Sequence, residues 1–174
     1  MKSDITAIIL IFTVLGCFCL CSNPASPGDD QILFGIFLLN DPASGISEAD
    51  DTPLEKLELH QTPWLSLDNI DKYDLNTHTI YVNDIWLTEN DSLLLSKYSH
   101  GSPFVVVAGN ERIYLGTFWW FWSSDLCKWP HFYSDPPGGI TENRIRIFHS
   151  QISPVDVRLD PRIFRVLARH GKIY

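Results

Sequence analysis

Hydrophobic and polar positions divide the chain into an apolar leader, a short polar stretch and a long segment of mixed pattern. The apolar run over 5–15 follows Lys2 and is shorter than the roughly 20 apolar residues that a membrane-spanning helix needs. Such a run is typical of the central part of an export signal. Residues 22–30 are rich in Pro, Ser, Gly and Asp and predict a flexible tether. We therefore expect a signal peptide over 1–21, the tether over 22–30 and a single globular domain over 31–174.

Alternating and β-branched stretches in the globular segment predict several strands. The clearest unit is a hairpin, in which a valine-rich strand over 104–108 runs into Gly109-Asn110 and returns over 112–117. Glycine and asparagine both tolerate the positive φ that tight hairpin turns require. Further strands are predicted over 32–38, 54–59, 77–82 and 144–148.

The sequence predicts fewer helices than strands, and capping residues at the helix ends are the main signals that locate them. Apolar residues with a partly helical spacing predict a helix over about 89–98. Ser66 and Asp68 offer N-caps for a short turn of helix that runs through Tyr73.

The C-terminal region carries the best-defined helix. Asp160-Pro161 provides an N-cap followed by proline at the first helical position, and Gly171 closes the helix. Strands and helices in this order predict an α+β fold: a mixed or mainly antiparallel sheet of about five strands with two helices packed on one face.

The leader ends in Val14-Leu15-Gly16-Cys17, which resembles the lipobox of bacterial lipoproteins. The resemblance implies that Cys17 receives a diacylglycerol, and two buried acyl chains at ~0.8 kcal/mol per CH₂ give stable anchoring. Phe18 in place of Asp after this cysteine implies, for a Gram-negative cell, the periplasmic face of the outer membrane. The alternatives are ordinary signal cleavage after Cys19, Cys21 or Ser22, or an uncleaved anchor. Lipidation and both alternatives place the globular domain outside the cytoplasm, either attached to the membrane or released from it.

Composition and charge narrow the classes of partner. The net charge of −8 argues against nucleic acid, because phosphate neutralisation needs clustered, unpaired Lys and Arg. Residues 1–100 carry four bases and fifteen acids, whereas residues 101–174 carry nine bases and six acids. A partner would meet two differently charged faces, unless the two halves interleave on folding. Cys127 is alone in the globular segment, so an internal disulfide framework is excluded.

Five stretches of the globular segment share a pattern with known exported proteins. They resemble a group of uncharacterised bacterial exported lipoproteins, and the likeness covers most of 32–150. The hairpin and the predicted helix before it are also similar to the small α+β periplasmic head of the SecD-type translocon subunit. Neither resemblance implies a known activity, so neither implies site residues. The five stretches are Trp64–Ile70, Tyr73–Asp74, Thr77–Ile80, Gly101–Val107 and Glu111–Gly116.

Candidate catalytic residues are few. No two histidines fall at i, i+4 on a predicted helix and there is no His-Glu-x-x-His motif, so the sequence predicts no metal site and no cofactor. An envelope hydrolase would need His78 or His149 to meet Asp74. Cys127, with His131 four residues later, is the candidate nucleophile, but a thiolate needs a base held against it.

The most distinctive feature is the run of five aromatic residues over 118–122. Side chains alternate along a strand, so rings from this run fall on both faces, and some must pack under another element or face outward. Exposed rings suit a protein partner, a sugar ring or the membrane interface, and the alternative is that the run fills the core. The candidate binding surface consists of Trp119, Trp120, Trp122 and Trp129.

These patterns together predict a membrane-tethered envelope lipoprotein that acts as a non-enzymatic binding module. Its expected contacts are membrane lipid through the N-terminal anchor and an envelope protein or component through the aromatic run and flanking arginines. Two alternatives stay open. One is an envelope hydrolase that uses the histidines with Asp74, and the other is an inhibitor or immunity-type lipoprotein whose acidic half occupies the cleft of a basic enzyme.

Overall fold

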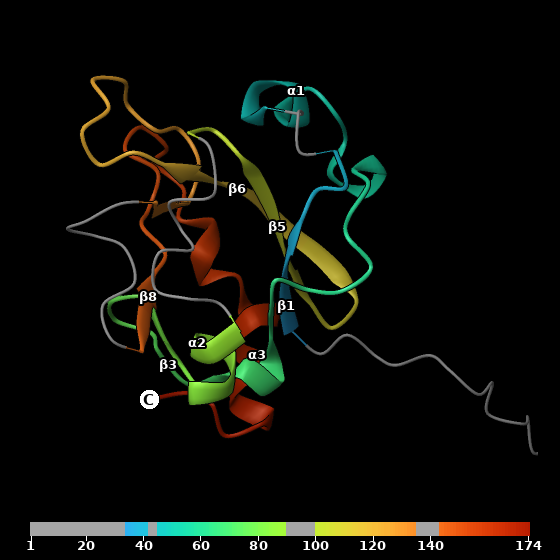
Figure 1. Ribbon diagram of the computed structural model, residues 1–174, viewed down its shortest axis with the longest axis vertical. Helices are drawn as coiled ribbons and strands as arrows, with labels where there is room; N and C mark the ends of the chain where they lie inside the picture. Colours follow the sequence, from blue (N-terminus) through green and yellow to red (C-terminus); the bar gives the residue numbers. More distant parts are fainter. Residues whose placement is uncertain (1–33, 42–44, 90–99, 135–142) are drawn as a thin grey trace, which may run out of the picture. The chain divides into compact units, whose positions relative to one another are not determined.

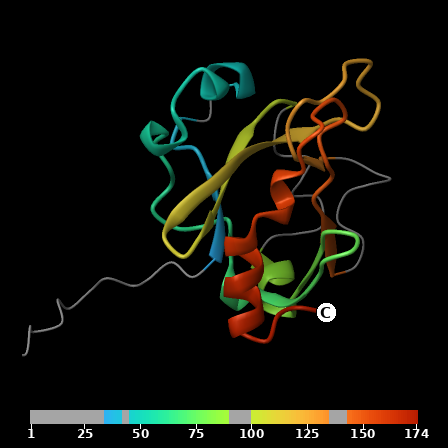
Figure 2. The same ribbon diagram turned by 180° about the vertical axis from the view of Figure 1, so that it is seen from behind.

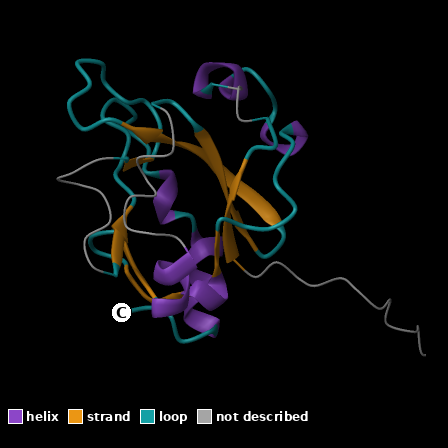
Figure 3. Ribbon diagram, in the orientation of Figure 1, coloured by secondary structure: helices purple, strands orange, loops and turns teal. Residues whose placement is uncertain are grey.

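The computed structural model describes residues 34–41, 45–89, 100–134 and 143–174. The predicted signal peptide and tether lie outside these ranges. The described residues form a mixed five-stranded sheet, a three-stranded sheet and three short helices (Figure 3). The α+β class and the mixed five-stranded sheet are therefore confirmed, while the second sheet and the third short helix were not predicted. Within the described part of the chain, no helix is both long enough and apolar enough to cross a bilayer.

The larger sheet has the strand order β2-β1-β5-β6-β7 (Figure 1). Its first four strands pair antiparallel, and β7 runs parallel to β6. The valine-rich strand β5 is central and buried along its whole length, as three consecutive valines require. The strands are β1 (Phe34–Leu38), β2 (Leu65–Ser66), β5 (Pro103–Ala108), β6 (Glu111–Trp119) and β7 (His131–Tyr133).

The predicted hairpin is confirmed as the β5–β6 pair. Gly109 and Asn110 have φ values of 61° and 68°, the positive values that a tight primed turn needs. Farther along β6, a Cβ on Gly116 would overlap the ring of Phe104 and lie 2.8 Å from the carbonyl oxygen of Pro130. Glycine at this position therefore lets β6 approach both β5 and the segment that leads into β7.

The second sheet has the order β3-β4-β8, with β3 (Ile70–Asp74), β4 (Thr79–Val82) and β8 (Arg144–Arg146) paired antiparallel. Alternate residues of β4 and β8 point inward, whereas in β3 a register shift between Ile70 and Lys72 brings Ile70 and Tyr73, three residues apart, to the same face. The inward side chains join the main core with Trp86 of α2 (Asp84–Glu89). Buried residues on this face are Ile70, Tyr73, Ile80, Val82 and Ile145.

The C-terminal helix α3 (Pro161–Arg169) follows its predicted ends. The Asp160 carboxylate accepts a hydrogen bond from the backbone amide of Arg162 at 2.9 Å, and Gly171 takes a φ of 65° after the last turn. Ile163 and Leu167 face the core. Figure 2 shows this red C-terminal segment beside the five-stranded sheet.

The two faces of the five-stranded sheet pack against different partners. Val106 joins the main core, to which α3 and the second sheet also contribute. Val105 and Val107 point the other way and pack under α1 (Ile46–Asp50) and the 3₁₀ turn η1 (Leu54–Lys56). The acidic α1–η1 segment and the C-terminal helix thus lie on opposite sides of this sheet.

Two local predictions were wrong. The turn of helix through Tyr73 is a single 3₁₀ turn, η2 (Leu67–Asn69), because Ser66 and Asn69 close it by reciprocal capping and β3 begins immediately afterwards. The strand over 54–59 is instead η1, and only a single bridge between Leu59 and Leu39 remains. The helix predicted over about 89–98 lies almost wholly outside the described residues, and α2 ends at its first position.

Candidate functional site

The aromatic run divides at the end of β6. Phe118 lies in the core, where its ring centroid is 5.6 Å from that of Phe104, and Trp119 is only 8% exposed. The next three side chains leave the strand and are 44%, 51% and 67% exposed at Trp120, Phe121 and Trp122. The strand end therefore decides which rings face solvent.

A second loop adjoins the exposed aromatic residues. The backbone amide of Gln151 donates to the carbonyl of Cys127 at 2.8 Å, and the amide of Cys127 donates to the Gln151 side-chain oxygen at 2.6 Å. These bonds bring Leu126 and Ile152, which are 65% and 55% exposed, to the same region. The two segments, orange and red, lie side by side in Figures 1 and 2. We call this the two-loop surface: Trp120, Phe121, Trp122, Leu126 and Ile152.

Trp129 has a different role. Its indole nitrogen donates to the Asp50 carboxylate at 2.9 Å, and Lys128 bonds the other oxygen of that carboxylate at 2.9 Å. Burial raises the pKa of Asp50, but the hydrogen bonds from Trp129 and Lys128 outweigh burial and hold this pKa below its ordinary value. Trp129 thus ties the aromatic loop to α1.

The four predicted tryptophans are therefore placed differently: Trp120 and Trp122 are exposed, Trp119 is buried and Trp129 is half-buried. Sequence reasoning counted Phe121 in the aromatic run but did not assign it to the surface. Ile152 gave no sequence signal, because only the fold brings it beside the aromatic loop.

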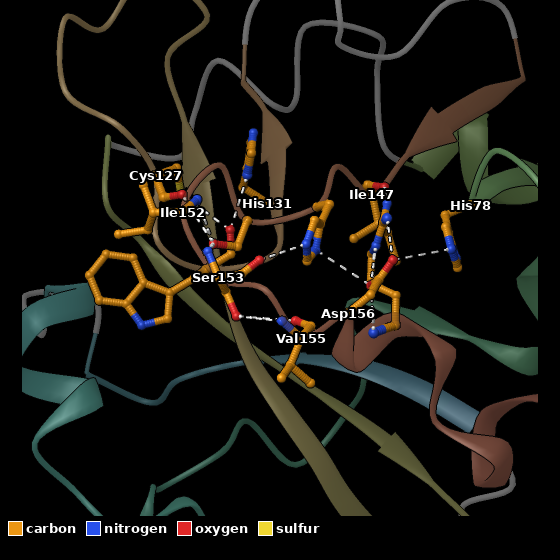
Figure 4. Close-up of polar contacts among 12 residues, drawn as sticks. His78, Cys127, His131, Ile147, Ile152, Ser153, Val155 and Asp156 are labelled. Atoms are coloured by element: carbon orange, nitrogen blue, oxygen red, sulfur yellow. Dashed lines mark hydrogen bonds and ion pairs between the residues drawn. The ribbon is translucent and has the colours of Figure 1, made fainter.

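The densest polar cluster centres on Asp156 (Figure 4). Arg158 binds this carboxylate with two nitrogens, at 2.8 Å and 2.7 Å, and its third nitrogen donates to the carbonyl of Ile147 at 2.7 Å. Arg158 is buried despite its charge, which is tolerated because its donors are satisfied. Hydrogen bonds from Arg158 hold the pKa of Asp156 below its ordinary value, so the carboxylate is ionised at neutral pH.

Two histidines flank the same carboxylate. His78 Nε2 lies 4.0 Å from one oxygen, and His149 Nδ1 lies 3.5 Å from the other. The Nδ1 atom of His78 is 2.8 Å from the hydroxyl of Tyr73. Burial, reinforced by the positive charge of Arg158, lowers the pKa of His78 to about 4. His78 is therefore neutral at neutral pH.

The histidines meet Asp156 rather than Asp74, the partner that the hydrolase alternative required. The Asp74 carboxylate accepts from the amide of Asn76 at 2.9 Å and from the hydroxyl of Thr77 at 2.8 Å, so it closes the β3–β4 turn. The spacing of residues 149–158 does not by itself predict the cluster, because His78 joins it from the turn before β4 and only the fold brings that histidine to Asp156.

Cys127 and His131 do not form a nucleophile–base pair. The Cys127 thiol donates to the carbonyl of Trp129 at 3.3 Å, and His131 Nδ1 lies 3.1 Å from the same oxygen. Burial raises the pKa of Cys127 to about 11, so the side chain stays a neutral thiol. Burial also lowers the pKa of His131.

Two open depressions, of about 260 and 370 Å³, surround α1 and η1, and their lining residues include neither Asp156 nor the residues of the two-loop surface. Acidic side chains line much of them. Across the described ranges, no group of three or more His, Cys, Asp or Glu residues is arranged to hold a metal ion. The acidic lining residues are Asp41, Glu48, Asp50, Asp51 and Glu58.

The chain matches no family model, no curated protein and no solved structure. Its chemistry must therefore be judged from its own geometry. That geometry offers an exposed apolar surface and a buried charged cluster in which the Ser153 hydroxyl bonds the backbone of Val155 while His149 faces the Ser153 carbonyl.

Proposed function

We propose that this protein is an exported, membrane-tethered interaction module that binds a protein partner through the two-loop surface. The observation that carries the proposal is the exposure of three consecutive aromatic side chains, over 120–122, in a loop that also exposes Leu126 and is bonded through Cys127 to the loop of Ile152. Soluble domains rarely expose large apolar side chains contiguously unless a partner covers them. Covering them would contribute roughly 25 cal/mol for each Å² of apolar area removed from water.

The chemistry of the two-loop surface favours a protein over a sugar. Tryptophan and phenylalanine are the anchors typical of protein interfaces, where they fill the pockets of a partner. A sugar would need polar side chains placed beside the rings. Two of the neighbouring polar side chains are engaged within the protein, since Ser123 accepts the amide of Asp125 at 3.2 Å and Lys128 pairs with Asp50.

Site-specific photocrosslinking in native cells tests this proposal. A photoreactive residue at Trp122 is expected to give a discrete crosslinked product with a protein. The matched control is Ile85 on α2, which is 66% exposed but distant from the two-loop surface. A second probe at Glu55, in the acidic α1–η1 segment, tests the inhibitor alternative.

The outcomes separate the hypotheses. A product at Trp122 with none at Ile85 supports the two-loop surface. A product at Glu55 alone would favour an inhibitor that offers its acidic segment to a basic enzyme. Equal products at Trp122 and Ile85, or none at Trp122, would contradict the proposal.

A further inference from the structure

A histidine joins the aromatic run to form a continuous array of rings. The ring of His100 lies against those of Trp119 and Trp120, with centroid distances of 3.9 and 4.9 Å. The ring of Trp120 is in turn 6.4 Å from that of Trp122. We call these four side chains the ring array: His100, Trp119, Trp120 and Trp122. The ring array brings a third segment, which precedes β5, to the two-loop surface.

The same histidine holds the backbone of Trp120. The amide of Trp120 donates to Nδ1 of His100 at 3.2 Å, so this nitrogen presents a lone pair. Burial lowers the pKa of His100, and the nearby carboxylate of Asp125 offsets part of that effect. His100 is therefore neutral at neutral pH, and the ring array carries no charge.

The two exposed indoles of the ring array keep a polar group available. Trp120 and Trp122 are 44% and 67% exposed, and no group in the described part of the chain accepts a hydrogen bond from either indole nitrogen. By contrast, the indole nitrogen of the buried Trp86 donates to the carbonyl of Trp64 at 2.9 Å. A ligand that covers the exposed rings without supplying acceptors would leave these donors unsatisfied, which weakens binding.

The backbone conformation of the ligand decides whether acceptors are available. An α-helix uses its main-chain carbonyls in its own hydrogen bonds, and a β-strand ligand pairs with the edge of a sheet rather than with the side chains of a loop. A polyproline II segment has no internal hydrogen bonds, so its carbonyls are free to accept. Its proline rings are apolar and its conformation is set before binding, which lowers the entropy lost on association. The ring array therefore fits a proline-rich segment better than a helix or a strand.

Asp125 adds a charge beside the uncharged rings. Its side chain is exposed, and no described residue forms an ion pair with it. Its carboxylate is nevertheless close enough to His100 to affect the pKa of that ring. A negative charge at the margin of an apolar surface favours a ligand that carries a basic residue at the corresponding position.

We propose that the ring array binds an extended, proline-rich segment of the protein partner, with a basic residue of that segment beside Asp125. This inference rests on the proposed function, because it specifies the kind of segment that the two-loop surface binds. Trp120 and Trp122 offer their rings to the prolines and their indole N–H groups to the main-chain carbonyls of the segment.

Titration of the purified full-length protein with a synthetic peptide tests the proposal. The probe is one arginine followed by about nine prolines, a sequence that forms a polyproline II helix by itself. We expect the indole N–H resonances of Trp120 and Trp122 to shift as the probe is added, while that of Trp86, which is already bonded, stays unchanged.

Two control peptides keep the arginine and the length of the probe but change its backbone. One is rich in glycine and serine and is flexible, and the other is rich in alanine and helical. Each should bind at least about fivefold more weakly than the probe, because neither presents free carbonyls in a fixed extended conformation.

Single substitutions separate the polar contacts from the rings. W120F and W122F keep an aromatic ring but lose the N–H donor, so each should weaken binding of the probe about fivefold. D125N removes the charge and should weaken it about twofold to threefold. The matched control is Y174F, which removes the polar hydrogen of a side chain that is 75% exposed and lies outside the ring array. It should leave binding unchanged.

Equal affinity for the probe and the glycine–serine peptide, or full affinity in W120F, W122F or D125N, would overturn this inference. A crosslink at Trp122 in cells would then still support the two-loop surface as a binding site for another kind of protein segment. Absence of that crosslink would reject the proposed function by itself, because the peptide titration involves no cellular partner.

Discussion

The protonation state of Asp156 is set by the side chains around it. Arg158 satisfies both carboxylate oxygens, and this arrangement keeps an anion stable where two histidines and two sheets meet. His78, on the other hand, loses more by burial than it gains from the carboxylate 4.0 Å away, so it stays uncharged. The cluster therefore combines a permanent ion pair with a buried neutral base.

The neutral state of His78 predicts loss of stability in acid. An unfolded histidine takes up a proton near pH 6.5, whereas folded His78 does so only near pH 4. Between these values the unfolded state binds more protons, so the free energy of unfolding increases with pH. We expect it to fall by about 1–3 kcal/mol as the pH drops from 6.5 to 4. Urea unfolding at several pH values measures this slope.

His78→Gln provides the control for that slope. Glutamine cannot titrate, so the pH dependence between 6.5 and 4 should flatten, even if the variant is less stable overall. Below about pH 4 both proteins should lose further stability, because the lowered pKa of Asp156 contributes only while that carboxylate is ionised. If the pH slope of stability is unchanged in His78→Gln, a titrating group other than His78 is responsible for it.

At the scale of elements, Arg112 is one of the side chains that hold the α1–η1 segment against the larger sheet. Arg112 on β6 donates from a single nitrogen to the carbonyls of Leu54 and Leu57 at 2.6 and 2.7 Å. Leu57 and Ala49 complete the smaller core beneath this segment. These hydrogen bonds therefore hold the α1–η1 segment in position over one face of the larger sheet.

Arg112→Met is expected to lower the free energy of unfolding by about 1–3 kcal/mol, because two carbonyls lose a charged donor. Amide exchange over 54–57 should accelerate more than exchange in β5. Arg165→Met, at an exposed position of α3, is the matched control and should change stability little. Equal effects of the two substitutions would show that Arg112 contributes no more than a surface charge.

Elements with strong local chemistry could be predicted from the sequence. Gly109-Asn110 and Asp160-Pro161 each specify a backbone geometry by themselves, and both the hairpin and the terminal helix follow. Parallel pairing of β7 with β6 has no such local signal, because it joins segments separated by a long loop. The division of the strands into two sheets likewise depends on distant pairing.

The candidate site was predictable only in part for the same reason. The aromatic run was evident in the sequence, but the end of β6 decides that Trp119 is buried and Trp120 is exposed. Ile152 and Asp156 acquire their roles from tertiary contacts. A sequence pattern of period two or 3.6 carries no information about such contacts.

At the scale of the whole molecule, the two halves of the chain interleave in both sheets. In the larger one β1 and β2 from the first half join β5, β6 and β7, and in the smaller one β3 and β4 join β8. The acidic character of the first half is nevertheless retained in the α1–η1 segment, which covers one face of the larger sheet. The strands of the acidic and basic halves are thus mixed in the two sheets, but the α1–η1 segment keeps the acidic character of the first half.

The proposed anchor makes a prediction for the whole protein. Cys17→Ala should move the protein from the membrane fraction to the soluble extracytoplasmic fraction. The resemblance to a lipobox assigns the acyl chains to Cys17, so this substitution removes their attachment point. Cys19→Ala preserves the lipobox and should fractionate like the parent protein. Membrane association that persists in Cys17→Ala would contradict lipidation and leave ordinary signal cleavage or an uncleaved leader.

The aromatic loop is secured at both of its bases. The pairing of β6 with β7 closes one side, and the bonds from Trp129 to Asp50 and from Cys127 to Gln151 close the other. Side chains at its tip, over 120–126, contribute little to the interior, so they are open to replacement while the scaffold continues to fold. Under the proposed function, a few substitutions at this tip would change the choice of partner during evolution, and the same tip is a suitable site for grafting a new recognition sequence.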